Sequence, residues 1–224
     1  MSSIAFVAPV KDIDAARSFA REVSGQRKAE YLESRKRLDV TKERIFLGQS
    51  PMGAMILGYS EGINPGFRMA QVAVSQNAFD KFYLASVIKM SGADFTKMPA
   101  GPPPHLAFEW TNGKHGKAAT MMAAPVPDAA KFWQLCRAMS QRYAEHSESR
   151  ARHGITLERA FLMHDAKMAV VYIEGDDPVA AMERSMASTA GYDKWFTQEI
   201  SRVHGIDFAA AKPPPPEPLF AFDA

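Results

Sequence analysis

Two sets of side chains in this sequence have the chemistry needed to hold an oxygenated ligand. Each set joins an arginine, a tyrosine and a glutamate: Arg44, Tyr59 and Glu61 in the first half, and Arg159, Tyr172 and Glu174 in the second. A guanidinium fixes a negative charge and a phenol donates a hydrogen bond, so either set could orient a carbonyl, a phenolate or a carboxylate. We therefore assign catalysis to Tyr172 and ligand binding to the other five residues.

The same residues also allow a structural interpretation. An arginine opposite a glutamate on a neighbouring strand is a common cross-strand ion pair, which needs no ligand to explain it. Under this alternative the chain is a non-catalytic structural or assembly protein.

His146 is the candidate general base. It follows Tyr143 by three residues on the apolar side of an expected helix, from which it could reach a cavity. A half-buried structural histidine is the alternative. If the protein bound haem, His146 or His204 would be the ligand. Otherwise we expect no cofactor, and no metal, because the histidines lack the close spacing of metal ligands.

Several function classes lose support from the sequence. It contains no GxSxG, P-loop, GxGxxG or CxxC motif, which argues against phosphate, nucleotide and acyl-enzyme chemistry. The 27 basic and 25 acidic residues are interspersed, so a nucleic-acid surface is not expected. No apolar run approaches the roughly 20 residues of a membrane helix. The single cysteine, Cys136, fits a reducing cytoplasm and is expected to be a buried thiol.

The chain contains an internal repeat. Nine of fifteen positions are identical between residues 33–47, ESRKRLDVTKERIFL, and residues 148–162, ESRARHGITLERAFL. Further matches join Tyr59 to Tyr172 and Glu61 to Glu174. We expect two ferredoxin-like domains, 1–112 and 117–224, joined by a polar linker at 113–116.

Each copy shows the same succession of hydrophobic patterns. Short apolar runs that end at proline predict first strands, and Asp12 and Asp128 are expected to cap the helices that follow. A hairpin, a second helical region and a last strand complete the order βαββαβ, twice. In the expected hairpin register Arg44 lies opposite Glu61 and Arg159 opposite Glu174, so both sets share one face of their sheets. The sequence thus predicts an α+β protein.

The residues resemble the dimeric α+β barrel superfamily, in particular small uncharacterised bacterial families within it. The resemblance rests on Glu158–Leu162, Tyr172–Gly175 and Asp193–Trp195, with matching positions in the first copy. It implies two antiparallel sheets that face each other as a pseudo-symmetric barrel, and it allows whole chains to pair as a homodimer. It also implies a small-molecule ligand and a cofactor-independent monooxygenase or isomerase acting on a partly apolar oxygenated compound. Haem-degrading members keep a haem-binding barrel open as an alternative.

Overall fold

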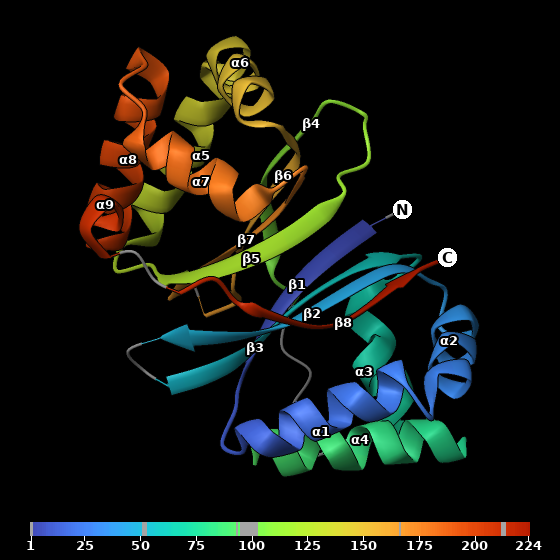
Figure 1. Ribbon diagram of the computed structural model, residues 1–224. Helices are drawn as coiled ribbons and strands as arrows, with labels where there is room; N and C mark the ends of the chain where they lie inside the picture. Colours follow the sequence, from blue (N-terminus) through green and yellow to red (C-terminus); the bar gives the residue numbers. More distant parts are fainter. Residues whose placement is uncertain (1, 51–52, 93, 95–102, 166, 212–213) are drawn as a thin grey trace. The chain divides into compact units, whose positions relative to one another are not determined.

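The order of helices and strands repeats the pattern βαββαβ along the chain, and the α+β class is confirmed (Figure 1). The structure is a computed structural model that describes residues 2–50, 53–92, 94, 103–165, 167–211 and 214–224. Among the helices described, none combines the length and the apolar character needed to cross a bilayer.

The first of two units comprises Met1–Pro103 together with Pro216–Ala224. Its helices α1 to α4 lie together on one side of a four-stranded antiparallel sheet (Figure 1). Its elements are β1 (Ser2–Pro9), α1 (Ile13–Ser24), α2 (Lys28–Arg37), β2 (Val40–Ser50), β3 (Gly53–Gly62), η1 (Pro65–Phe67), α3 (Arg68–Val74), α4 (Ala78–Ser91) and β8 (Glu217–Asp223).

The second unit comprises Pro104–Pro215. It has the same plan, with helices on one side of a second four-stranded antiparallel sheet. Its elements are β4 (His105–Thr111), β5 (Ala118–Pro125), α5 (Ala129–Gln141), α6 (Tyr143–His153), β6 (Ile155–Leu162), β7 (Met168–Gly175), α7 (Pro178–Ala187), α8 (Gly191–His204) and α9 (Phe208–Ala211).

The two repeats exchange their last strands. The strand order is β1-β3-β2-β8 in the first unit and β4-β6-β7-β5 in the second. Strand β8, which ends the second repeat, therefore pairs with β2, and β4, which ends the first repeat, pairs with β6. The boundaries 1–112 and 117–224 mark the two repeats as sequence similarity defines them. The two structural units differ from these repeats, because each unit contains one complete sheet. Each exchanged strand pairs an edge whose backbone groups would otherwise lack partners.

Local signals in the sequence set the helix ends. Asp12 accepts a hydrogen bond from the backbone N–H of Ala15, and Asp128 accepts from Ala130, so both expected N-caps are confirmed. Gly154 and Gly205 end α6 and α8 with φ near +70°, a conformation that favours glycine.

The hairpin register differs from the prediction by two residues. Arg44 lies opposite Tyr59, and Arg159 lies opposite Tyr172, rather than opposite Glu61 and Glu174. The faces are unchanged, because side chains alternate with a period of two and a shift of two preserves the face. The additional residues of the first hairpin lengthen its two strands, because β2 ends only at Ser50 and β3 begins at Gly53.

Candidate functional site

An apolar cavity of about 170 Å³ lies between the helices and the sheet of the first unit. Helices α1 and α4 and strands β1, β2, β3 and β8 form its walls. The lining residues are mainly aliphatic and aromatic: Phe6, Val7, Ala8, Phe19, Ile45, Ile56, Tyr83, Val87, Met90, Ser91, Leu219 and Phe220. An apolar cavity of roughly 150 Å³ is large enough to hold one benzene ring. The space therefore suits a ligand with a single ring.

Small residues on two elements help to keep this space open. Gly58 lies opposite Phe6 in the β1–β3 pair, and a Cβ at position 58 would overlap the Phe6 ring, which lines the cavity. On α4, Ser91 stands where the second repeat has His204. The imidazole of His204 packs 5.7 Å from the Phe208 ring and bonds to the Pro125 carbonyl oxygen through Nδ1 at 2.7 Å. The first repeat carries a much smaller side chain there.

Tyr83 joins the apolar cavity to a buried polar network. The guanidinium carbon of Arg35 lies 4.5 Å from the centre of the Tyr83 ring, and Arg35 is only 3% exposed. Burial raises the pKa of Tyr83 to about 12, although the charge of Arg35 and a hydrogen bond from it oppose the rise. Tyr83 therefore keeps its proton at neutral pH and can act as a hydrogen-bond donor.

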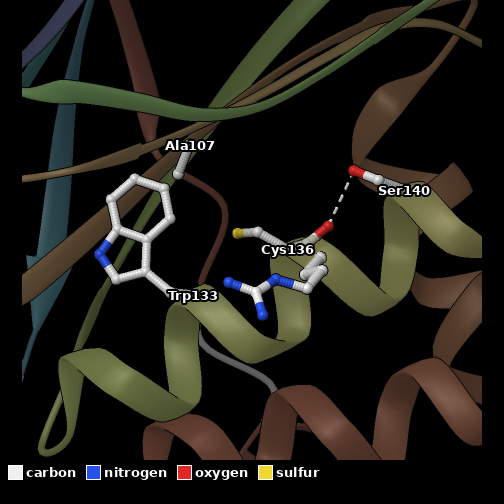
Figure 2. Close-up of a pocket in the computed structure, with 5 residues that line it drawn as sticks. Ala107, Trp133, Cys136 and Ser140 are labelled. Carbon is white, nitrogen blue, oxygen red and sulfur yellow. Dashed lines mark hydrogen bonds between the residues drawn. The ribbon is translucent and has the colours of Figure 1, made fainter.

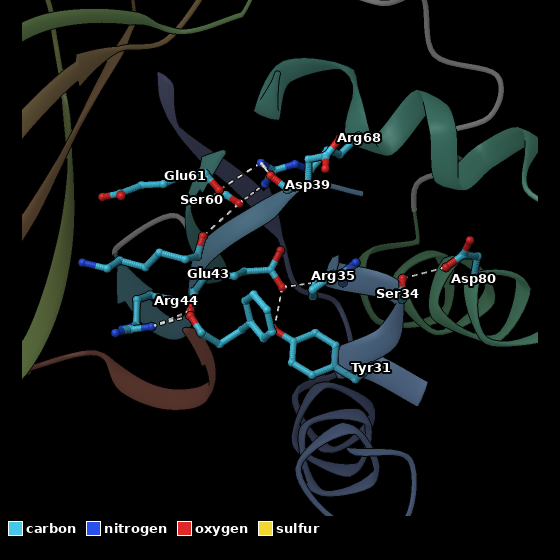
Figure 3. A network of polar contacts seen from close by, with 12 residues as sticks. Tyr31, Ser34, Arg35, Asp39, Glu43, Arg44, Ser60, Glu61, Arg68 and Asp80 are labelled. Atoms are coloured by element: carbon cyan, nitrogen blue, oxygen red, sulfur yellow. Dashed lines mark hydrogen bonds and ion pairs between the residues drawn. The ribbon is translucent and has the colours of Figure 1, made fainter. Parts of the chain in front are cut away.

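Glu43 is the centre of that network (Figure 3). Its Oε2 accepts a hydrogen bond from the Tyr31 hydroxyl at 2.7 Å and another from Arg35 Nε at 2.8 Å. Glu43 and Arg35 are both buried, and they form an ion pair in which each charge compensates the other. Burial strongly raises the pKa of Tyr31, with the charge of Glu43 as the next cause.

The second unit has a matching network with different hydrogen-bonding groups. Arg150 and Glu158 form the buried ion pair, and His146 stands where the first repeat has Tyr31. His146 Nδ1 lies 2.8 Å from the Tyr192 hydroxyl, and Nε2 lies 3.3 Å from Glu158 Oε2 without hydrogen-bond geometry. Burial alone would raise the pKa of Glu158, but the charge of Arg150 and the contacts with His146 hold it far below its usual value.

The predicted ligand-binding residues lie on the sheet face that points away from the helices. There the Tyr59 hydroxyl donates to Glu61 Oε1 at 2.5 Å, and the Tyr172 hydroxyl donates to Glu174 Oε1 at 2.5 Å. The arginines instead bind acidic residues of the exchanged strands. Arg44 pairs with Asp223 of β8 at 2.8 Å, and Arg159 pairs with Glu109 of β4.

The structure does not bring His146 and Tyr172 together. His146 on α6 lies on the helix-covered face of its sheet, 5.0 Å from the Phe108 ring, and it is completely buried. Tyr172 on β7 alternates with Ile173, which belongs to the helix-side core, so the tyrosine points to the opposite face. With the sheet between them, the two side chains cannot act on the same ligand atom.

A second pocket, of about 250 Å³, lies beside α5 in the second unit and is lined by five residues, Ala107, Trp133, Cys136, Arg137 and Ser140 (Figure 2). Burial raises the pKa of Cys136 to about 12, with the nearby charge of Glu158 as a second cause. Cys136 is 4% exposed and stays a thiol, which makes it a poor nucleophile. The expectation of a buried thiol is confirmed.

Sequence reasoning missed Tyr83, Arg35 and Glu43. Tyr83 belongs to an apolar helical stripe that looks like core packing alone. Arg35 and Glu43 lie in the matched segment and have identical counterparts in Arg150 and Glu158. Charged residues retained in both halves of a diverged repeat were the available signal for this buried network.

Comparisons with known proteins give structural relatives only. No model of a protein family matches the chain, and no curated protein matches it in sequence. A "putative monooxygenase" of Fusobacterium nucleatum subsp. nucleatum has TM-score 0.58 and 11% identity, over 99% of this chain and 93% of that one. Another, of Lactobacillus acidophilus, has TM-score 0.50 and 12% identity, over 91% and 89%. An "anthrone oxidase-like protein" has TM-score 0.49 and 10% identity, over 98% and 92%. The first two likenesses establish that this chain shares their ferredoxin-like α+β fold.

Proposed function

We propose that the first unit binds a small, partly apolar, oxygenated compound with a single ring, in the cavity between its helices and its sheet. The observation on which this rests is the cavity itself, apolar along its walls and about the volume of one substituted benzene ring. Tyr83 and Ser91 supply hydroxyl groups among the described lining residues.

The cavity supports ligand binding better than the sheet face does. On that face the hydroxyls of Tyr59 and Tyr172 already donate to glutamates of their own strands. A ligand at either tyrosine would have to replace a charge-assisted hydrogen bond, which is stronger than a neutral one. The cavity offers apolar surface and a protonated phenol instead.

The reaction class that we propose is monooxygenation without a cofactor. The names of two proteins with this fold support it, as does a cavity whose size and apolar walls suit a single ring. In such a reaction the substrate supplies the electrons that reduce O2, for example when an activated CH2 group and O2 give a carbonyl group and water. An isomerase acting on a similar compound would leave dissolved oxygen unchanged. Oxygen consumption measured with an electrode, on adding methylhydroquinone to the protein, distinguishes the two after subtraction of the rate without protein.

Calorimetric titration with p-cresol tests the binding step. A ligand of this size is expected to bind with a dissociation constant on the order of 0.1–1 mM. Ala8→Phe adds a ring to the cavity wall and should abolish binding. Ala124 is the equivalent residue of β5 in the second repeat, so Ala124→Phe is the matched control and should leave binding unchanged. Equal binding by both variants would place the ligand elsewhere.

A further inference from the structure

At one position in the wall of the cavity, the two repeats differ by a single hydroxyl group. Tyr83 on α4 corresponds to Phe196 on α8, because Asp80 aligns with Asp193 three residues earlier. Both rings lie against the buried arginine of their own unit. The guanidinium carbon of Arg35 is 4.5 Å from the Tyr83 ring centre, and that of Arg150 is 4.6 Å from the Phe196 ring centre.

The Tyr83 hydroxyl is therefore not needed for this packing. Phenylalanine makes the same cation–π contact in the second unit, at a distance that differs by only 0.1 Å. A buried hydroxyl costs free energy unless it finds a partner, so its presence in the first unit calls for a separate reason.

The surroundings of Tyr83 supply that reason. The other hydroxyl among the described lining residues, that of Ser91, donates to the carbonyl oxygen of Val87 at 2.7 Å within its own helix. Glu43 Oε2 already accepts from Tyr31 and Arg35. Arg35, whose guanidinium carbon lies 4.5 Å from the Tyr83 ring centre, has only N–H donors and cannot accept the phenol proton, so that proton needs another acceptor.

We propose that Tyr83 is the specificity-determining residue of the cavity, and that its hydroxyl donates a hydrogen bond to the oxygen of a phenol- or enol-type ligand. Arg35 is a positioning residue that packs against the ring from the side of the buried network. This inference rests on the proposed binding function of the same cavity. The expected ligand class consists of compounds that carry a single oxygen atom at one end of an apolar ring.

The test compares two ligands of nearly equal shape, p-cresol and toluene, with the whole chain and with Tyr83→Phe. Phenylalanine fits the same position in the second unit, so the variant is expected to fold, and circular dichroism checks that it does. The unaltered protein should prefer p-cresol about tenfold over toluene, because the phenol oxygen has a partner in the cavity. Tyr83→Phe should reverse or remove this preference while toluene affinity changes by less than about twofold.

A purely structural effect of the substitution would change the affinities for both ligands by the same factor, so it would leave their ratio unchanged. Phe196→Tyr, in the second unit, is the matched control and should leave the ratio unchanged. If both ligands bind and the ratio is the same in Tyr83→Phe, the assignment of Tyr83 is wrong while the binding function stands. If neither ligand binds the unaltered protein, the binding function fails and the assignment of Tyr83 fails with it.

Discussion

Arg44 Nη2 donates a hydrogen bond to Asp223 Oδ1 at 2.8 Å, although the two residues are 179 positions apart in the sequence. Arg44 also donates through Nη1 to the carbonyl oxygen of Phe222 at 2.8 Å. The equivalent pair in the second unit is Arg159 with Glu109. In both units the arginine of the second strand of the repeat therefore holds the strand contributed by the other repeat.

The contribution of this ion pair to stability is expected to be small. The Asp223 side chain is 62% exposed, and exposed ion pairs stabilise proteins by about 0–1 kcal/mol. A double-mutant cycle with Arg44→Ala and Asp223→Ala, followed by urea unfolding, should give a coupling energy of about 0.5 kcal/mol. A coupling above about 2 kcal/mol would show that the pair is a principal stabilising contact rather than a fine adjustment of register.

The exchanged strand β8 should be necessary for the first unit. Phe222 is 3% exposed and belongs to the core of that unit, so Phe222→Ala is expected to cost about 3–5 kcal/mol. Phe108→Ala, at the equivalent position of β4, should cost a similar amount through the second unit. A chain that ends at Pro215 should lose thermal stability and recover it when a peptide of residues 216–224 is added. No effect of truncation would contradict the pairing of β8 with β2.

The buried Arg150–Glu158 pair should make the second unit sensitive to acid. The folded-state pKa of Glu158 is lowered, so its contribution to stability is complete above the unfolded value of about 4.3 and is lost as pH falls below it. Glu158→Gln leaves the Arg150 charge without its carboxylate and should cost about 3–5 kcal/mol at pH 7. The penalty should shrink progressively as the pH falls below about 4.

The exposed Glu145 on α6 offers the control for that prediction, because Glu145→Gln should cost less than about 1 kcal/mol. The free energies of unfolding of both variants, measured at several pH values, test this prediction. A penalty for Glu158→Gln that is independent of pH would mean that the carboxylate charge does not stabilise the folded state.

Exchanging the polar groups of one network for those of the other should show strong coupling. The second unit pairs His146 with Tyr192, whereas the first has Tyr31 and Phe79 at the same positions. His146→Tyr alone is crowded by the Tyr192 hydroxyl, and Tyr192→Phe alone leaves His146 Nδ1 without its partner. The double variant restores the first unit's arrangement, so it should be more stable than the sum of the single variants predicts, by at least about 1 kcal/mol. Simple additivity in thermal unfolding would contradict the equivalence of the two networks.

The order of strands and helices was predictable because its signals are local. Asp12 and Asp128 mark helix starts, and proline ends the first strands, whatever the rest of the chain does. The exchange of β4 and β8 was not predictable, because the residues of an apolar strand do not reveal which of two similar sheets it joins. The hairpin register was wrong by two residues for a related reason: alternation fixes the face of a strand but not its offset.

The candidate site was harder to predict than the fold. The sheet-face arginines were expected beside glutamates of the hairpin, yet they bind Asp223 and Glu109, which the sequence places far away. Tyr83 and Arg35 lie on helices whose patterns suggest ordinary packing and solvent exposure. Only the tertiary structure shows that Arg35 is buried against Tyr83 and that a cavity adjoins them.

A crystal structure of the protein soaked with 4-bromophenol tests the central claim most directly, because bromine is located by its anomalous scattering. The expected result is a bromine peak inside the cavity bounded by Phe6 and Met90, with the phenol oxygen about 2.7 Å from Tyr83 Oη. A saturating soak that leaves the cavity empty, or that places bromine only on the sheet face beside Tyr59 or Tyr172, would contradict the assignment of the ligand site to the cavity.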